Sequence, residues 1–391
     1  MNRYTLNIAA FAALLSGCSG SQPPIGAPGA MPQTRPFAAR GDSSSFKVVY
    51  SFGGSADGSR PTASLIDVNA TLYGTTESGG AYGQGTVFSI TPSGKEKVLH
   101  SFGHGTDGSG PLASLIEVKG TLYGTTATGG KHGAGTVFSV TPSGTEKVLH
   151  TFSGGRGGSD GAFPAASLIE VKGKLYGTTR AGGTYAGSYY EGCGYGGNSG
   201  CGTVYSIMPS GKERVLHSFG NGIDEGASPL ASLIEVNGEL YGTTMGGGKT
   251  GQGTVFTITL NGNEKVLHSF GPGNGTDGGS PFASMIEGKG TLYGTTEFGG
   301  SSKTTSGGCY YVSICGTIFS ITPSGTEKLL HSFGNGTDGS GPLASLIEVK
   351  GKLYGTTAYG GAYYHNGDAG TVFNITINGT EKVLHSFGNG T

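Results

Sequence analysis

Residues 72–102 read "LYGTTESGGAYGQGTVFSITPSGKEKVLHSF", and near copies of this stretch recur along most of the chain. The pentapeptide "LYGTT" begins at positions 72, 122, 175, 240, 292 and 353. A repeat with a period of about fifty residues is typical of a solenoid, a propeller or another array. The repeat therefore decides the fold, and the rest of the sequence is interpreted around it.

Each repeat contains four short runs with the composition of β-strands. They have the forms "ASLIEV", "LYGTT", "GTVFSIT" and "EKVLHSF", and Gly, Pro, Asn and Ser bound them. Val, Ile, Thr, Tyr and Phe favour strands, and no sustained helical period appears after residue 46. Four-stranded antiparallel units in tandem are the blades of a β-propeller. We therefore predict an all-β propeller domain over residues 46–391.

The strand types occur in unequal numbers. The first three occur six times, whereas the fourth occurs seven times, from "KVVYSF" at residue 47 to "EKVLHSF" at residue 381. We predict six blades, with residues 47–52 completing the blade formed by residues 343–377. The alternative is a seven-bladed ring, in which one blade would lack three strands.

The repeat also resembles known propeller sequences. The pattern "P-x-A-S-L-I-E-V-x-G-x-L-Y-G-T-T-x-x-G-G" is similar to kelch repeats but lacks their tryptophan. The whole unit, with "LYGTT…GG…GTVFSIT" present six times, more closely resembles the GloVer tandem repeat of choice-of-anchor proteins. That resemblance covers residues 46–391. It implies an extracytoplasmic, propeller-like repeat and no established activity.

The connections between the strands fall into two classes. The spacing from strand one to strand two, as from Ile66 to Leu72, and from strand three to strand four, as from Phe88 to Phe102, never changes. The connections after strand two contain 8, 8, 22, 8, 19 and 12 residues, and those after strand four also vary. Alternate connections of an antiparallel meander lie at opposite ends. We therefore expect one constant face and one variable face.

The repeated polar residues have structural explanations. One histidine recurs in six of the seven fourth-strand runs (His100, His150, His217, His268, His331 and His385), but the outer strands lie too far from the centre for these residues to share one metal ion. An aspartate recurs in the loop before each first strand (Asp57, Asp107, Asp160, Asp224, Asp277 and Asp338), and it is best explained as a turn residue. We predict no metal ion and no cofactor.

The residues that do not repeat are the candidates for function, since repetition usually serves the fold. Tyrosines collect in the long inserts at 180–201, 297–315 and 358–369. Tyrosine offers a rigid, half-polar surface that suits recognition, although such rings can also pack within their own loops. The predicted ligand-binding residues are Tyr185, Tyr189, Tyr190, Tyr195, Tyr310, Tyr311, Tyr359, Tyr363, Tyr364 and His365.

Four cysteines lie in two of these inserts. Cys193 and Cys201 share one insert, and Cys309 and Cys315 share another. Local pairing is the simplest of the three connectivities, and an exported chain permits disulfides. A zinc site is the alternative, although no C-x-x-C spacing is present. We predict the disulfides Cys193–Cys201 and Cys309–Cys315.

The N-terminal residues have the features of a targeting segment. Arg3 precedes the short apolar run "IAAFAALL", and "LSGC" at residues 15–18 resembles the bacterial lipobox. This resemblance implies a signal peptide over residues 1–17, a lipid on Cys18 and an extracytoplasmic site, at the outer membrane in a diderm cell. An ordinary signal peptide is the alternative. Residues 18–45 are rich in Pro, Gly and Ser and read as a flexible linker.

Two functions remain open at this point. The chain has a net charge of −1 and no basic run, so nucleic acid is not an expected partner. No nucleophile motif or isolated carboxylate pair identifies a catalytic residue. We therefore favour a lipid-anchored binding or scaffold module for a glycan, peptide or protein. The alternative is an exported enzyme that acts on polysaccharide at the same variable face.

Overall fold

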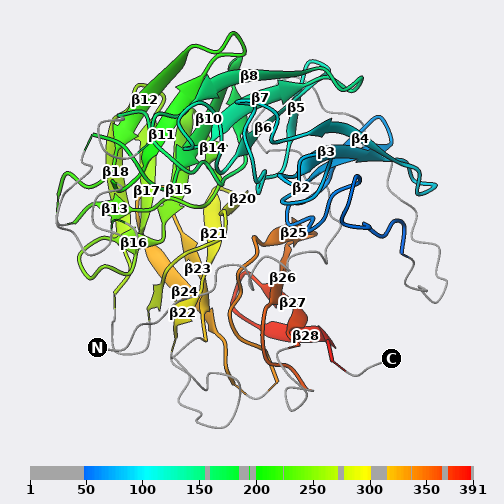
Figure 1. The fold of residues 1–391 in the computed structure, drawn as a ribbon. Coiled ribbons are helices and arrows are strands. Elements are labelled where there is room, and N and C mark those ends of the chain that lie inside the picture. Colours follow the sequence, from blue (N-terminus) through cyan, green and yellow to red (C-terminus); the bar gives the residue numbers. More distant parts are fainter. Residues whose placement is uncertain are drawn as a thin grey trace, which may run out of the picture.

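The computed structural model describes residues 48–154, 159–184, 193, 200–222, 224–271, 277–300, 315–335, 337–362 and 369–388. These residues form six four-stranded antiparallel sheets, each with its strands in chain order. The sheets follow one another around a common centre as propeller blades (Figure 1). The same residues contain no helix that could span a bilayer. The predicted all-β fold of four-stranded antiparallel units is confirmed.

The first two strands of each sheet form a tight hairpin. The first strands are β1 Ile66–Val68, β5 Ile116–Val118, β9 Ile169–Val171, β14 Ile234–Val236, β20 Ile286–Gly288 and β25 Ile347–Val349. The second strands are β2 Thr71–Thr76, β6 Thr121–Thr126, β10 Lys174–Thr179, β15 Glu239–Thr244, β21 Thr291–Thr296 and β26 Lys352–Thr357. First strands of neighbouring sheets contact each other around the centre, as β14 contacts β20.

The third and fourth strands complete each sheet toward the outside. The third strands are β3 Thr86–Ile90, β7 Thr136–Val140, β11 Thr203–Ile207, β17 Thr254–Thr259, β23 Thr317–Ile321 and β27 Thr371–Thr376. The fourth strands are β4 Glu96–Ser101, β8 Glu146–Thr151, β12 Glu213–Ser218, β18 Glu264–Ser269, β24 Glu327–Ser332 and β28 Glu381–Ser386. Two short ladders, β13 Gly226–Ala227 with β16 Gly246–Gly247 and β19 Gly278–Gly279 with β22 Phe298–Gly299, join connections.

The glycine of "LYGTT" is required by packing within the sheet. Gly74 pairs with Phe88 on the third strand, and the Phe88 ring lies across the space where a side chain would stand. A Cβ on Gly74 would lie 2.7 Å from the Phe88 ring and 2.5 Å from the Leu65 side chain. Both distances are shorter than a carbon–carbon contact permits. The glycine therefore makes room for the aromatic ring that fills the core.

Successive sheets are joined by a repeated aromatic contact. The phenylalanine after each of the first five fourth strands meets the aromatic ring of the next third strand, as Phe102 meets Phe138 at 4.9 Å between centroids. The ring planes are steeply inclined, which is a favoured arrangement for aromatic pairs. Nearer the centre, the Ser114 backbone N–H donates a hydrogen bond to Ser167 Oγ of the next sheet at 3.0 Å. Each of the four internal sheets thus buries one face against its predecessor and the other against its successor.

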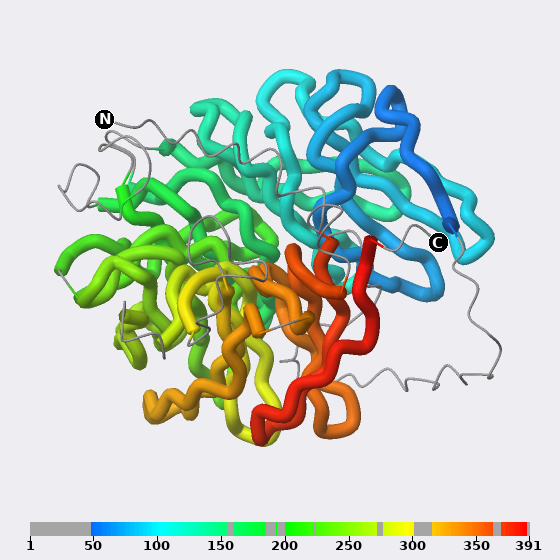
Figure 2. The backbone as a smooth tube through the Cα atoms, turned by 90° about the horizontal axis from the view of Figure 1, so that it is seen from below, coloured from blue at the N-terminus to red at the C-terminus, as the bar shows by residue number. Residues whose placement is uncertain are grey.

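The predicted pairing of residues 47–52 with the last sheet is wrong. The fourth strand of that sheet is β28, so the sheet of β25–β28 is complete without them. Residues 48–52 belong to no sheet and pack instead beside the first sheet, where Phe52 meets Phe88. The first and last sheets lie on the same side of the molecule (Figure 2). The sequence pattern identified a fourth-strand copy correctly but could not show which sheet it would face.

The packing at the "LYGTT" glycine predicts a large effect of one methyl group. In Gly242→Ala, the added Cβ would stand 2.6 Å from the Phe256 ring. We expect the free energy of unfolding to fall by about 1–3 kcal/mol, the usual range for an overfilled core. In the control, Gly222→Ala, the Cβ meets no atom within 4 Å, and Gly222 is not in the left-handed region. Chemical denaturation would measure both variants, and equal stabilities would contradict this account of the core.

Candidate binding face

The two variable connections of each sheet lie together at one end. The connection after strand two bridges to the connection that leads into strand one, as Ser78 pairs with Ser59 and Thr128 with Ser109. The short ladder of β13 with β16 joins the same two connections in the fourth sheet. The constant turns must therefore lie at the opposite end. This confirms the predicted division, and we call the end with the variable connections the variable face.

A threonine pair forms the base of the variable face in each sheet. Thr76 Oγ1 lies 2.9 Å from Thr86 Oγ1 and accepts a hydrogen bond from the Thr86 backbone N–H at 3.1 Å. Gly58 covers this pair so closely that a Cβ on it would collide with the Thr76 side chain. The same pair recurs in the other sheets, for example Thr244 with Thr254 at 2.8 Å. The variable connections therefore begin at buried, hydrogen-bonded positions.

The repeated histidine and the repeated acid hold each other. His100 Nε2 lies 2.9 Å from Asp107 Oδ2, and Asp107 Oδ1 accepts a hydrogen bond from the Gly103 backbone N–H at 3.0 Å. The aspartate thus closes its own turn, as predicted, while the histidine braces it. We call this pair the His–carboxylate clasp. Clasps occur at His100–Asp107, His150–Asp160, His217–Glu225, His268–Asp277 and His331–Asp338.

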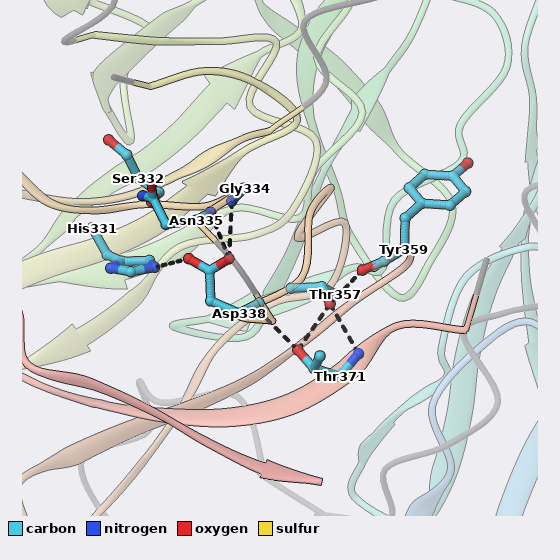
Figure 3. Close-up of polar contacts among 8 residues, drawn as sticks. All are labelled: His331, Ser332, Gly334, Asn335, Asp338, Thr357, Tyr359 and Thr371. Carbon is cyan, nitrogen blue, oxygen red and sulfur yellow. Dashed lines mark hydrogen bonds and ion pairs between the residues drawn. The ribbon is translucent and has the colours of Figure 1, made fainter. Parts of the chain in front are cut away.

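Figure 3 shows the clasp that leads into the last sheet. Asp338 accepts hydrogen bonds from the backbone N–H groups of Gly334 at 3.1 Å and Asn335 at 2.9 Å, while His331 approaches its other oxygen. Thr371 Oγ1 donates to the Asp338 backbone oxygen at 3.2 Å, which connects the clasp to the threonine pair. The clasp and the threonine pair are therefore parts of one polar network.

One predicted turn residue is corrected by the structure. In the connection after β12, Glu225 rather than Asp224 contacts the histidine, with His217 Nε2 2.7 Å from Glu225 Oε1. The Gly220 and Asn221 backbone N–H groups donate to the other oxygen at 2.8 and 2.5 Å. The longer glutamate side chain reaches the same donors from one position later. Burial opposes ionisation, but His217 and these amides hold the pKa of Glu225 below its ordinary value.

A second carboxylate from the next sheet lies behind the clasp. Burial raises the pKa of Glu146, Glu213 and Glu264 to about 7, and the neighbouring clasp acid adds to this for Glu146. One oxygen of each of these side chains is buried and has no hydrogen-bond partner. Each of these three interfaces between sheets therefore holds two acids. At two of them the pKa of the clasp acid, Asp160 or Glu225, is lowered, so the clasp acid is the better stabilised as an anion.

One of these groups has a spacing that would suit a metal ion. Among the described residues, the ligand atoms of His217, Glu225 and Glu264 lie within 4.8 Å of one another. A cleft of about 620 Å³ runs past Glu225 and Glu264, and Lys249 also lines it. Equivalent clasps close the turns at the other interfaces, which indicates that the histidine and its acid serve the fold here too.

Only one of the predicted ligand-binding residues is within the described part of the chain. Tyr359 is half-buried, and its backbone oxygen accepts a hydrogen bond from Thr357 Oγ1 at 3.1 Å. Its ring points away from the clasp of the same region (Figure 3). The other predicted residues lie outside the described residues: Tyr185, Tyr189, Tyr190, Tyr195, Tyr310, Tyr311, Tyr363, Tyr364 and His365, as does the predicted lipidation site Cys18.

Cysteines in two of these inserts form disulfides. Cys193 and Cys201 form a disulfide, with 4.4 Å between their Cα atoms, so the predicted local pairing is confirmed for this insert. Both side chains are buried, and Cys201 lies two residues before the start of the third strand β11. Cys315 is also disulfide-bonded. Its predicted partner, Cys309, lies outside the described residues.

A pair of aromatic residues on the variable face was not predicted from the sequence. Tyr82, in the connection after β2, is 51% exposed, and its ring centroid lies 5.4 Å from that of His104 in the connection after β4. Both residues lie in connections without long inserts, which the search for inserts passed over. They differ from the residues at the same places in other repeats, and that difference was the available signal.

Comparisons with known proteins agree with the repeat. A family described as Gloeobacter/Verrucomicrobia repeat matches residues 37–190 and 186–391. No curated protein matches the chain. Among solved structures, a putative 6-phosphogluconolactonase from Bacteroides uniformis is 13% identical, with a TM-score of 0.47, covering 81% of this chain and 82% of that one. A gluconolactonase from Xanthomonas campestris is 13% identical, with a TM-score of 0.40, covering 74% and 79%. Likenesses this distant do not transfer an activity.

The buried glutamates predict that stability depends on pH. Their pKa of about 7 in the folded protein lies above the ordinary value of 4.5. The folded state therefore binds more protons than the unfolded state between these values, and stability falls as pH rises through this window. Replacing Glu146, Glu213 and Glu264 together by Gln should flatten the dependence. After allowance for solvent screening, we expect a gain of about 0.5–1 kcal/mol per site at pH 8.

Denaturation at several pH values from 5 to 8 would test this expectation. Protonation of the clasp acids Asp160 and Glu225 does not interfere in that range. Their pKa values are lowered, so their contribution to the free energy of unfolding is lost only in more acidic solution. A triple variant that keeps the wild-type slope would show that these glutamates are not the source.

Proposed function

This chain belongs to the Gloeobacter/Verrucomicrobia repeat family, and we propose that it is an exported, lipid-anchored propeller that binds a ligand on its variable face. The observation that carries this proposal is the contrast between the two ends of the sheets. Every length change falls on the variable face, while the clasps and threonine pairs fix the base of those connections. Variable loops on a rigid base are the usual arrangement of a recognition surface.

The aromatic content of the variable face favours a glycan, peptide or protein as the ligand. Tyr82 and His104 lie together there, and Tyr359 begins the insert that carries Tyr363, Tyr364 and His365. Aromatic rings supply apolar area with few rotatable bonds, and the tyrosine hydroxyl adds a hydrogen-bonding group. The disulfide Cys193–Cys201 restricts the insert that holds the largest group of tyrosines, which lowers the entropy lost on binding.

The N-terminal sequence supports a surface location for this module. Cys18 completes the lipobox-like "LSGC", and residues 19–45 would separate the propeller from the membrane as a flexible linker. A lipid on Cys18 with this linker would let the variable face turn toward ligands outside the cell. In a diderm cell the anchor would lie in the outer membrane.

One observation favours an exported enzyme as the second candidate. Glu264 and Glu225 line the same cleft, and their pKa values are displaced in opposite directions. Carboxyl groups with separated pKa values are typical of acid and base pairs in polysaccharide cleavage. Against this, Glu225 already accepts backbone hydrogen bonds that close its turn. We therefore rank binding first.

The anchor can be tested by fractionation of cells. The variant Cys18→Ser should move from the membrane fraction to the soluble extracytoplasmic fraction, because no lipid could be attached. The control Ser21→Ala, in the adjoining linker, should fractionate as the wild type does. Membrane association of Cys18→Ser at the wild-type level would contradict the anchor.

The binding face can be tested by replacing its inserts. Each of residues 180–201, 297–315 and 358–369 would be exchanged for the eight-residue connection 127–134, which another sheet already uses. We expect a folded protein that no longer binds the glycan or surface protein found in a screen with the wild type. Single changes such as Tyr190→Ala or Tyr364→Ala should weaken binding by about 1–3 kcal/mol if the ring anchors the ligand.

The reciprocal exchange of constant turns gives the control. Substitution of residues 141–144, "TPSG", by "TLNG", the equivalent residues 259–262, should leave binding unchanged, because that turn lies at the opposite end of its sheet. Full binding by the protein with three shortened inserts would exclude the variable face as the ligand site.

A further inference from the structure

The last sheet differs from the other five on its outer face. The phenylalanines after the first five fourth strands, Phe102, Phe152, Phe219, Phe270 and Phe333, are completely buried. The equivalent Phe387 is 41% exposed, and Leu384 on the same strand is 46% exposed. The buried residues each meet an aromatic ring of the following sheet, as Phe333 meets Phe373. The outer face of β28 therefore carries the same residue types as an interface between sheets, but no further sheet covers it among the described residues.

A second contact between sheets also stops at the last sheet. The glycine before each third strand touches the proline that opens the next sheet, as Gly85 touches Pro111 and Gly253 touches Pro281. The atoms nearest to a Cβ placed on Gly370 all belong to residues 357 and 358. Among the atoms nearest to Gly370 there is therefore no proline, so the contact that would join the last sheet to a following sheet is absent from the described residues.

The first sheet is covered by residues 48–52 in place of the last sheet. The centroids of Phe52 and Phe88 are 4.9 Å apart, as in the contacts between complete sheets. A Cβ on Gly94 would lie 2.5 Å from the Val49 backbone oxygen, and Gly144 has the same relation to Leu99. Tyr50 donates to Asp57 at 2.8 Å, in the place of a His–carboxylate clasp. Residues 48–52 thus occupy the position of a fourth strand.

This fourth-strand position has no third strand beside it. Residues 48–52 pair with no strand among the described residues, and Val48 and Val49 are 57% and 46% exposed. An extended segment with an unpaired backbone accepts an added strand readily. The segment lies against the first sheet, and the exposed face of β28 belongs to the last sheet, so the two surfaces stand at the two ends of the array. We call the pair of surfaces, residues 48–52 and the Leu384–Phe387 face, the seam.

We propose that the seam is a docking site for a β-element of a partner protein that has the sequence pattern of strands one to three of this repeat. The interfaces between successive sheets of this chain show which kind of strand would cover each surface of the seam. A strand of the type "GTVFSI" pairs with every complete fourth strand, with Thr86 opposite Ser101 and Phe88 opposite Val98. In the same register, the added strand would place its threonine opposite Ser51 and its aromatic residue opposite Val48. Its ring would then cover Phe387.

The partner is specified by this packing and not by general hydrophobicity. At the internal interfaces, the ring that covers such a phenylalanine belongs to a strand whose neighbour carries glycine opposite it, as Gly355 stands opposite Phe373. A second copy of this chain does not offer such a strand, because its third strands are already paired on both sides. The proposal concerns a surface distinct from the variable face and does not rest on the ligand proposed for that face.

A peptide from the chain itself can test the seam. The probe is a fluorescent peptide of residues 83–94, "GQGTVFSITPSG", added to the full-length protein. We expect saturable binding, and hydrogen exchange at residues 48–52 should slow when the peptide is present. The variant Phe387→Ser should weaken binding at least about tenfold and change the thermal midpoint much less than the same change at the fully buried Phe333, because Phe387 is 41% exposed.

Matched controls distinguish specific docking at the seam from non-specific hydrophobic binding of the peptide. Phe163→Ser, at a residue that is 40% exposed elsewhere on the chain, should bind the peptide as the wild type does. A peptide with Ser in place of its Phe should bind at least about tenfold more weakly. Three results would overturn the proposal: no saturable binding up to about 1 mM, equal binding by Phe387→Ser, or protection confined to residues outside the seam. Self-association of the protein that buries Phe387 would also overturn it.

Discussion

The fold depends on one aromatic contact, in which the phenylalanine after a fourth strand meets the ring of the next third strand above a glycine, at all five junctions between successive sheets. Burial of a phenylalanine contributes about 1.5–3 kcal/mol, and an inclined aromatic pair adds about 0.5–1.5 kcal/mol. The same ring fills the core of its own sheet, since Phe138 lies against Gly124 and also against Phe102. A single aromatic side chain therefore packs both within its own sheet and against the preceding sheet. Because the glycine of "LYGTT" makes room for this ring, it is present in every repeat.

This contact also explains which connections can change in length. The turn between strands three and four packs against the preceding sheet, where Gly144 faces the Leu99 backbone oxygen. An insertion there would separate the two sheets and expose their rings. The connections at the other end leave the packed region beyond the threonine pair and the His–carboxylate clasp. Length changes there cost little, so the constraint that builds the array also creates a face free to acquire function.

The sequence was sufficient for the fold class, the four strand types and the division into two faces, because each follows from a pattern repeated six times. Residues 47–52 were misplaced because their strand pattern does not contain the information that β28 fills the last sheet. Asp224 was preferred to Glu225 because the aspartate fits the repeat, whereas the turn responds to the reach of the side chain. The pairing of Tyr82 with His104 joins two connections that only the fold brings together.

Every array of repeats has two ends whose surfaces were shaped for a neighbour, and such surfaces normally require a cap. Here the two ends are treated differently. Residues 48–52 cover the first sheet with a copied fourth strand that reproduces the ring contact, the glycine contact and an acid bonded to Tyr50. The last sheet has no equivalent cover on Leu384 and Phe387. Because a fourth strand is itself an incomplete sheet, the cap at one end creates an unpaired edge next to the uncovered face at the other. Residues 48–52 and the Leu384–Phe387 face are both complementary to strands one to three of the repeat. This shared complementarity arises because the first sheet is capped by a copy of the fourth strand of the repeat.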